Sequence, residues 1–160
     1  MVKNRRMHIH RLTPADLPLL HGVLDVFGEA FDDVPTYRDR RPGAAYLQRL
    51  LAGETLIALA AVEGGRVVGG IAAYELPKIE QARSEIYIYD LAVAEAHRRR
   101  GIATDLIAGL QRIAAARGAW VIYVQADLGD DPAIALYSKL GVREDVLHFD
   151  IPVRPRGCGK

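Results

Sequence analysis

Residues 98–104 (Arg-Arg-Arg-Gly-Ile-Ala-Thr) are the segment best suited to bind an anionic ligand, because they lie between a predicted strand and an amphipathic helix. The first turn of a helix carries unpaired N–H groups and a partial positive charge, which suit a pyrophosphate. Gly101 lets the backbone approach such a ligand closely, and the arginines stay charged at any cellular pH. The segment predicts a phosphate-binding turn; taken alone, it could equally be a solvated run of charges.

Asp90 is the carboxylate most difficult to explain without a function. It lies inside the otherwise apolar run 87–93 (Tyr-Ile-Tyr-Asp-Leu-Ala-Val), and a carboxylate is costly to bury unless it has a partner. We expect it to point at the reacting group, just before a bulge in its strand, and to act as a general base. Further carboxylates expected around a cleft for a cationic acceptor are Asp32, Asp33, Glu80, Glu85, Asp127, Asp130 and Asp131.

Several of these carboxylates have a simpler interpretation. Asp131 precedes a proline and would serve as a helix N-cap. Asp32 and Asp33 could be turn formers, and Glu80 could be solvated. No spacing of His, Asp or Glu predicts a metal site, and a single cysteine, Cys158, excludes an intrachain disulfide.

Composition limits the class of protein. The 160 residues carry a net charge of +1, but residues 1–11 and 154–160 hold seven bases and no acid, so residues 12–153 have a net charge of −6. This sign argues against nucleic-acid binding and suits a cationic ligand. No apolar run approaches the ~20 residues of a membrane span, so we expect a cytoplasmic protein that acts away from the membrane.

The pattern along the chain predicts an α/β (α+β) sheet with helices on both faces, in a single domain over residues 7–153. We expect the tail 154–160 to be disordered. The predicted strands are 7–12, 55–63, 66–76, 85–93, 120–126 and 146–153, and the predicted helices start at Thr13 (to about 31), 43, 101 (to 118) and 132 (to 140).

The turn at 98–104 matches the pyrophosphate loop of the GNAT superfamily of N-acetyltransferases, and the order of elements over 7–153 resembles that superfamily. The resemblance implies acetyl-CoA as cosubstrate and a mixed central sheet that splays at the acetyl-CoA site. The segment Ala133-x-x-x-Tyr137-x-x-x-Gly141 is similar to a second motif of the superfamily, which would make Tyr137 the acid that protonates the leaving thiolate. The implied coenzyme contacts are Leu91, Ala92, Val93, Arg98, Arg99, Arg100, Gly101, Ile102, Ala103 and Thr104.

This chain departs from that second motif at two positions. Asp130 stands where many members have asparagine, and Val142 stands where phenylalanine is common. The contacts that this asparagine makes in other members therefore do not carry over.

A closer resemblance, to the gentamicin 3-N-acetyltransferases, covers most of the chain. It implies a 2-deoxystreptamine aminoglycoside as acceptor and antibiotic resistance as the outcome. Our own hypothesis for the mechanism is direct acetyl transfer in a ternary complex. Two alternatives stay open: an N-acetyltransferase for another amine, such as a polyamine or a protein N-terminus, and a non-catalytic acyl-CoA sensor. Exposed edge strands in this fold often pair, so a homodimer is also considered. The segments that carry the resemblance are 27–34, 58–61, 73–78, 83–93, 123–133 and 148–151.

Overall fold

The computed structural model describes residues 6–153, so the predicted tail 154–160 lies outside the described residues. The chain divides between Gln125 and Ala126 into two compact units, and each is described by itself. One domain over residues 7–153 therefore stays a prediction.

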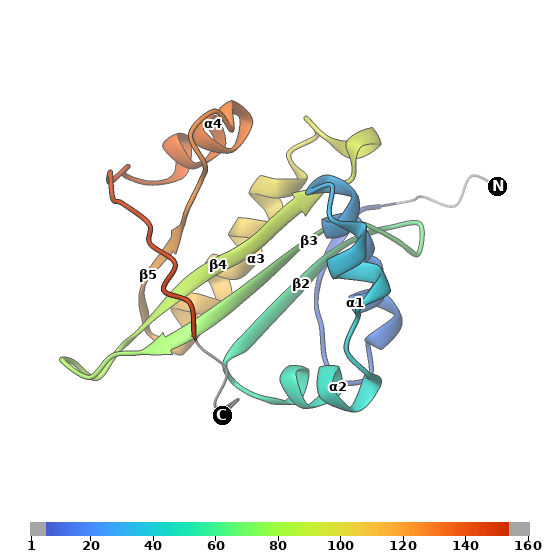
Figure 1. Ribbon diagram of the computed structural model, residues 1–160, viewed down its shortest axis with the longest axis horizontal. Helices are drawn as coiled ribbons and strands as arrows, with labels where there is room; N and C mark the ends of the chain where they lie inside the picture. Colours follow the sequence, from blue (N-terminus) through green and yellow to red (C-terminus); the bar gives the residue numbers. More distant parts are fainter. Residues whose placement is uncertain (1–5, 154–160) are drawn as a thin grey trace, which may run out of the picture. The chain divides into compact units, whose positions relative to one another are not determined.

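The first unit is a five-stranded sheet in the order β1-β2-β3-β4-β5, with helices on both faces (Figure 1). Neighbouring strands are antiparallel except β4 and β5, which are parallel, so the sheet is mixed, as predicted. The elements are β1 (His8–Arg11), α1 (Leu17–Ala30), the π-helix η1 (Pro35–Asp39), α2 (Ala44–Ala52), β2 (Leu56–Glu63), β3 (Arg66–Pro77), β4 (Ser84–Val93), the 3₁₀-helix η2 (Glu95–His97), α3 (Ile102–Arg117) and β5 (Ala119–Val124).

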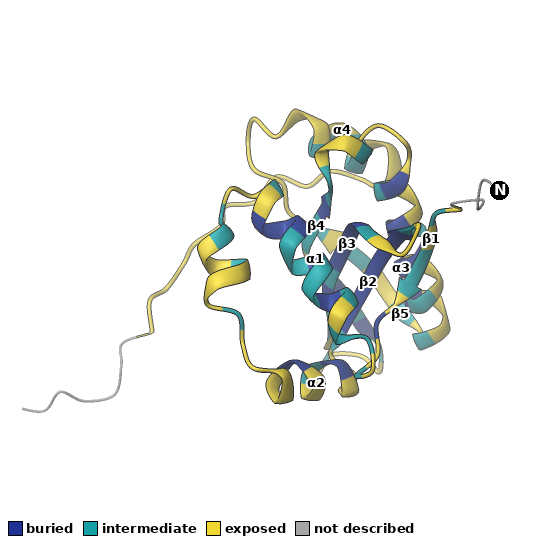
Figure 2. Cartoon of the chain, turned by 90° about the vertical axis from the view of Figure 1, so that its right-hand side faces the viewer, coloured by how far each residue is buried: buried dark blue, intermediate teal, exposed yellow. Residues whose placement is uncertain are grey.

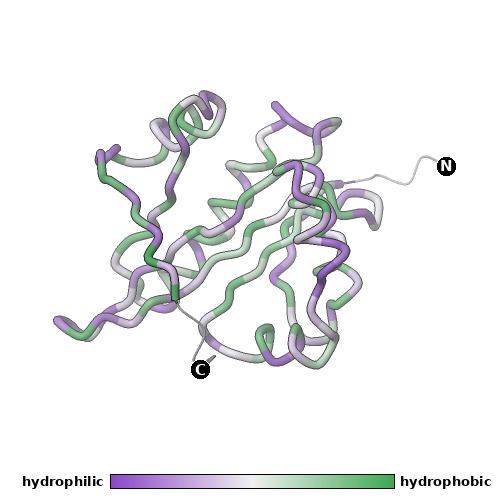
Figure 3. Tube along the Cα trace, viewed as in Figure 1, coloured by the Kyte–Doolittle hydropathy of each residue, from purple (hydrophilic) through white to green (hydrophobic). Residues whose placement is uncertain are grey.

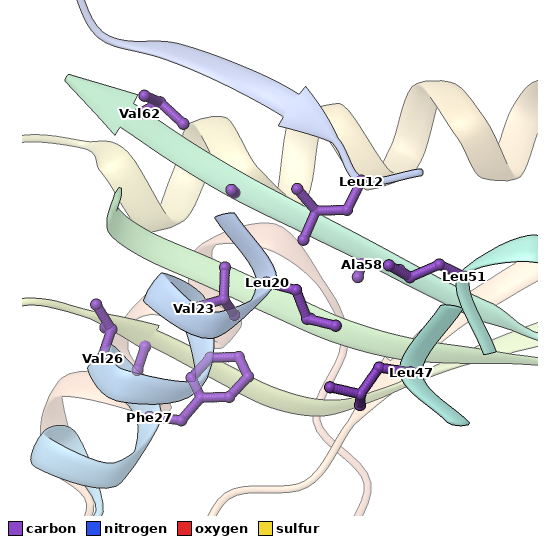
Figure 4. Packing of buried hydrophobic residues seen from close by; sticks show 11 residues of the cluster. Leu12, Leu20, Val23, Val26, Phe27, Leu47, Leu51, Ala58 and Val62 are labelled. Carbon is purple, nitrogen blue, oxygen red and sulfur yellow. The ribbon is translucent and has the colours of Figure 1, made fainter. Parts of the chain in front are cut away.

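The core has two layers, one on each side of the sheet. On one face, Val23 and Phe27 of α1 and Leu47 of α2 pack on alternate residues of β2, such as Ala58 (Figure 4). On the other face, Leu59 packs against α3 at Gly109, where an added Cβ would lie 3.5 Å from Cδ1 of Leu59. Figures 2 and 3 show the central strands β2 and β3 as mostly buried and largely hydrophobic. A strand that is covered on both faces is expected to have a continuous run of apolar residues. The sequence of β2 has such a run from Leu56 to Val62.

Helix α3 begins and ends at glycines. Gly101 and Gly118 have φ values of 81° and 71°, a left-handed conformation that glycine adopts without steric cost. The predicted limits of this helix are therefore confirmed.

The predicted start of α1 is wrong by three residues, because the N-cap is Asp16 and not Thr13. Thr13 donates hydrogen bonds from its N–H and its Oγ1 to Asp16 Oδ2, at 2.8 and 2.7 Å. These bonds close a turn before the helix, so Pro18 rather than Pro14 occupies the first helical turn.

The second unit contains α4 (Asp131–Leu140). Its N-cap is Asp130, whose Oδ1 accepts a hydrogen bond from the N–H of Ala133 at 3.3 Å, so the N-cap interpretation of Asp131 is wrong by one residue. The predicted strand 146–153 does not form: residues 142–153 have no regular secondary structure and pair with no strand in the described part of the chain. Among residues 6–153, no helix is long and apolar enough to cross a membrane.

Candidate active site

A β-bulge in β4 decides which way Asp90 points. Asp90 pairs with Ala72 of β3, whereas Ile88 pairs with Ala73, so Tyr89 is the extra residue. Side chains alternate along a strand, so without the bulge Asp90 would lie on the same face as the buried Ile88. Because Ala72 packs in the cluster under α1, Asp90 also faces α1. The bulge thus precedes Asp90, where the sequence analysis expected it to follow.

Asp90 has a hydrogen-bond partner that the sequence analysis missed. The hydroxyl of Tyr37 donates to Asp90 Oδ1 at 3.1 Å. Burial raises the pKa of Asp90, and the hydrogen bond from Tyr37 offsets part of that rise. Burial, followed by the Asp90 charge, raises the pKa of Tyr37, so the phenol stays a donor and the carboxylate an acceptor. A carboxylate with a raised pKa is a stronger base than an exposed one, which suits proton removal from an amine.

Tyr37 is held in place by η1, a short π-helix. Its ring contacts those of Phe27 and Phe31, with centroids 5.9 and 5.7 Å away. Two arginines flanking it, Arg38 and Arg41, pair with Asp25 of α1 at 3.0 and 2.8 Å. The sequence analysis predicted only a break here. Single-turn π-helices are frequent at functional sites, and this one brings a phenol to the carboxylate of β4.

Replacing Tyr37 by phenylalanine keeps the aromatic packing and removes only the hydrogen bond to Asp90. We expect kcat/KM to fall about fivefold, as for the loss of one hydrogen bond. Because that bond lowers the pKa of Asp90, the acid limb of the pH profile of kcat/KM should move to higher pH. The control is Tyr46→Phe, which removes a hydroxyl from α2. An unmoved acid limb in Tyr37→Phe would contradict the assignment.

The turn at 98–104 has the geometry expected of a pyrophosphate site. Gly101 and Arg99 both have positive φ, 81° and 60°, and α3 begins directly afterwards at Ile102. The first helical hydrogen bond joins the N–H of Asp105 to the Gly101 carbonyl, and no side chain caps the earlier N–H groups, so the turn can accept an anion. The residues predicted to contact the coenzyme here therefore fit that role.

Two of the three arginines in this turn already have partners. Arg98 Nε donates to the carbonyl of Val93 at 3.1 Å, and Arg100 pairs with Glu63 at 2.6 Å. His97 also lies 3.4 Å from Glu63. These contacts tie the turn to β4 and to the end of β2, so a ligand would meet a turn that is already ordered.

Strand β4 continues beyond the end of β5. The two strands pair from Ser84 to Ile88, and the last residue of β5 is Val124. In the described residues, 89–93 therefore have no strand partner on that side, as a splayed sheet requires. Leu91, Ala92 and Val93 lie in this stretch, where an extended ligand can pair as an added strand would.

The predicted acceptor carboxylates fall into separate groups. Asp32 is exposed, with a φ of 53°, and Asp33 Oδ1 accepts a hydrogen bond from the N–H of Thr36 at 3.2 Å, so both help to form the turn before η1. Glu80 and Glu85 pair with Lys78 at 3.6 and 3.4 Å, near the β3–β4 connection. The structure thus gives Glu80 and Glu85 a cationic partner that the sequence analysis did not foresee.

The remaining predicted residues lie in the second unit. Asp127 and Asp130 form the turn that leads into α4, in which the N–H of Asp130 donates to the carbonyl of Asp127 at 3.1 Å. Asp131 is the first residue of α4 and is exposed. Tyr137 lies on the same helix, and burial, followed by the Asp130 charge, raises its pKa to about 12. Their roles at the site stay predictions.

Residues 6–153 contain no group of three or more His, Cys, Asp or Glu side chains that could hold a metal ion. The features of the first unit that bear on chemistry are a half-buried carboxylate, an ordered turn suited to an anion and the open edge of a strand.

A model of the acetyltransferase (GNAT) family matches residues 21–142. The crystal structure of aminoglycoside acetyltransferase HMB0005, from an uncultured soil metagenomic sample, is 62% identical, covers 93% of this chain and 99% of its own, and has a TM-score of 0.91. That of aminoglycoside acetyltransferase meta-AAC0020, from an uncultured soil metagenomic sample and in complex with sisomicin, is 28% identical, covers 96% and 100%, and has a TM-score of 0.85.

Among curated proteins, an N-alpha-acetyltransferase of Sulfurisphaera tokodaii is 32% identical over 89 residues, which are 49% of this chain and 53% of that protein. A second, from Saccharolobus solfataricus, is 33% identical over 89 residues, with the same shares. The chain thus spans about half the length of the curated relatives it matches.

Proposed function

Since the chain belongs to the acetyltransferase (GNAT) family, we propose that it is an acetyl-CoA-dependent aminoglycoside 3-N-acetyltransferase that confers resistance to gentamicin-type antibiotics. The observation that carries the aminoglycoside assignment is the 62% identity to an aminoglycoside acetyltransferase along nearly the whole of both chains. The half-buried carboxylate of Asp90, which faces α1, and the net charge of −6 over residues 12–153 support a cationic acceptor.

Each part of the site has a role in a direct transfer. When bound, the coenzyme supplies an acetyl group activated as a thioester. The first turn of α3 and Arg98 would hold its pyrophosphate, and a backbone N–H within 91–93 would polarise the acetyl carbonyl. Asp90, directly or through a water, would take a proton from the 3-amine, and Tyr137 would give a proton to the departing sulfur.

Acetylation of an aminoglycoside amine removes a positive charge and adds bulk. Both changes weaken binding to ribosomal RNA, because the phosphate backbone attracts cations. A resistance role follows from this chemistry. A cytoplasmic location would place the enzyme beside that target, and it stays part of the proposal, as does pairing into a homodimer.

A protein N-terminus is the second candidate acceptor. The identity of 32% to an N-alpha-acetyltransferase favours it, although that match covers 49% of the chain. A polyamine or a purely coenzyme-binding role has no comparable support among these relatives.

The test is release of free thiol from acetyl-CoA with gentamicin, sisomicin, kanamycin, spermidine and an unacetylated N-terminal peptide as separate acceptors. We expect rapid release with gentamicin and sisomicin. Turnover with the peptide alone would move the function to protein N-termini, and turnover with spermidine alone would move it to polyamines. No thiol release with any of the five acceptors, despite tight coenzyme binding, would favour a non-catalytic acyl-CoA sensor.

A further inference from the structure

A row of tyrosine rings crosses three strands on the face that carries Asp90. The rings of Tyr87 and Tyr123 stack with centroids 4.9 Å apart and 15° between their planes. Tyr89 meets Tyr87 edge-on at 5.7 Å and Tyr74 edge-on at 6.0 Å. The row therefore runs without a gap from β3 through β4 to β5.

The same bulge that turns Asp90 also creates this row. The residue pairs Tyr74–Tyr87 and Tyr87–Tyr123 are direct partners in the sheet, so the alternation of side chains puts these three rings on one face. In a bulge, two successive residues point to roughly the same face. Tyr89 and Asp90 therefore both emerge on the side of Tyr87, and a carboxylate lies beside the middle of the row.

The row is open where it adjoins β5. Tyr89 is 63% exposed and Tyr123 38% exposed, whereas Tyr37 and Tyr74 are half-buried. Exposed aromatic rings in a continuous group are uncommon unless they bind something. Packing alone does not account for Tyr89, because its neighbours leave most of its surface uncovered.

The charges around the row select for a cation. Asp90 acts electrostatically on Tyr74 of the neighbouring strand β3 and on Tyr87 of its own strand β4. Asp33 acts on Tyr37 from the turn before η1. No arginine or lysine is among these interactions. Aromatic faces attract ammonium groups, more strongly where water is excluded. Nearby, Arg83 already lies 4.4 Å above the ring of Trp120, which shows the same attraction within this sheet.

We propose that Tyr87, Tyr89 and Tyr123 form a platform for one amine-bearing ring of the acceptor, either the aminocyclitol or an amino sugar, whose apolar face lies on the tyrosine rings while an ammonium group faces Asp90. This inference rests on the proposed function, because it assumes that the acceptor is an aminoglycoside. An amino sugar combines a flat apolar ring face with a fixed cation, and the platform offers a surface for each. A linear polyamine has the cation but no ring face.

The experiment compares the binding of sisomicin and spermidine by calorimetry, with coenzyme A present. Tyr89→Ala should raise the Kd for sisomicin about tenfold and change the Kd for spermidine less than about threefold, because only sisomicin has rings to lose contact with the platform. Tyr89→Phe keeps the ring and should bind sisomicin within about twofold of wild type. The matched control is Ile79→Ala, which removes a fully exposed hydrophobic side chain from the β3–β4 connection.

Three outcomes would overturn the platform. These are unchanged sisomicin affinity in Tyr89→Ala, equal losses for sisomicin and spermidine, or a loss in Tyr89→Phe as large as in Tyr89→Ala. If the first of these outcomes came with a change in the sedimentation of Tyr89→Ala, the rings would instead contact another part of the protein or a second copy of it.

Binding without turnover separates this inference from the proposed function. A wild-type protein that binds sisomicin and shows the Tyr89 effect, yet releases no thiol with it, would refute the transfer reaction and keep the platform. A wild-type protein that acetylates sisomicin while Tyr89→Ala binds it equally well would refute the platform alone.

Discussion

Asp90→Asn should lower kcat with an aminoglycoside acceptor about a thousandfold, the usual range for loss of a general base. Asparagine has nearly the same volume, and its oxygen can still accept the hydrogen bond that Tyr37 donates at 3.1 Å. What it cannot do is take a proton from the acceptor amine. Affinity for coenzyme A should stay within about twofold of wild type, since the phosphate turn is untouched. Steady-state kinetics and a coenzyme titration measure both.

The control is Asp39→Asn, which removes an exposed carboxylate from η1, the element that holds Tyr37. It should retain wild-type kcat. A loss of coenzyme binding in Asp90→Asn as large as its loss of turnover would contradict the assignment of Asp90 as the base.

The same substitution should change how stability depends on pH. Burial raises the pKa of Asp90 in the folded protein, so the folded state binds this proton more tightly than the unfolded state does. Stability of the wild type therefore falls as the pH rises from the unfolded pKa through the raised folded value, where the buried charge forms. Asp90→Asn lacks this charge, so its stability relative to wild type should increase over the same interval. Thermal unfolding from pH 4 to 8 measures the difference.

Tyr137→Phe should lower kcat about a hundredfold, because Tyr137 is the acid that we propose for protonation of the leaving sulfur. Burial, followed by the Asp130 charge, raises the pKa of Tyr137 to about 12, so its hydroxyl keeps its proton at neutral pH. Coenzyme and acceptor affinities should change little, because phenylalanine retains the ring. Pre-steady-state measurement of thiol release isolates the step.

Ser138→Ala, a change at the exposed next residue of α4, is the matched control. Should Tyr137→Phe turn over as fast as Ser138→Ala, water or another group would have to protonate the sulfur, and the role carried over from the superfamily motif would be wrong.

Much of the sheet could be predicted from the sequence because its signals are local. The predicted strands 55–63 and 66–76 are separated only by Gly64 and Gly65, a pair typical of a two-residue hairpin turn, and the structure joins them as the β2–β3 hairpin. The glycines at 101 and 118 indicated both ends of α3. These features can be read from one sequence, because they depend on the conformational freedom of glycine and on the spacing of apolar residues along the chain.

The orientation of Asp90 could not be predicted in the same way. A bulge adds one residue to one strand of a pair, and its position is visible only once the register with β3 is known. The sequence analysis expected the bulge after Asp90, whereas the register with β3 places it before Asp90. The hydrogen bond from Tyr37, 53 residues earlier, depends on the same long-range pairing.

In the second unit, the sequence pattern predicted a strand that the structure does not contain. Residues 146–153 alternate as a strand does, but alternation alone does not make a strand. Pairing with another strand is also needed, and residues 146–153 have no such pairing in the described part of the chain. In the first unit, the ion pairs of Lys78 with Glu80 and Glu85 were also not predicted, because these carboxylates were interpreted without the cations near them.

We propose that this acetyltransferase acetylates the 3-amino group of a 2-deoxystreptamine ring, and the structure of the reaction product tests this proposal most directly. Sisomicin, incubated with the wild-type protein and acetyl-CoA, should yield one mono-acetylated product whose NMR spectrum places the new amide at the 3-position, and Asp90→Asn should yield almost none. Acetylation at another amine would keep the enzyme class and refute the position. An unmodified antibiotic beside an acetylated peptide N-terminus would contradict the aminoglycoside assignment itself.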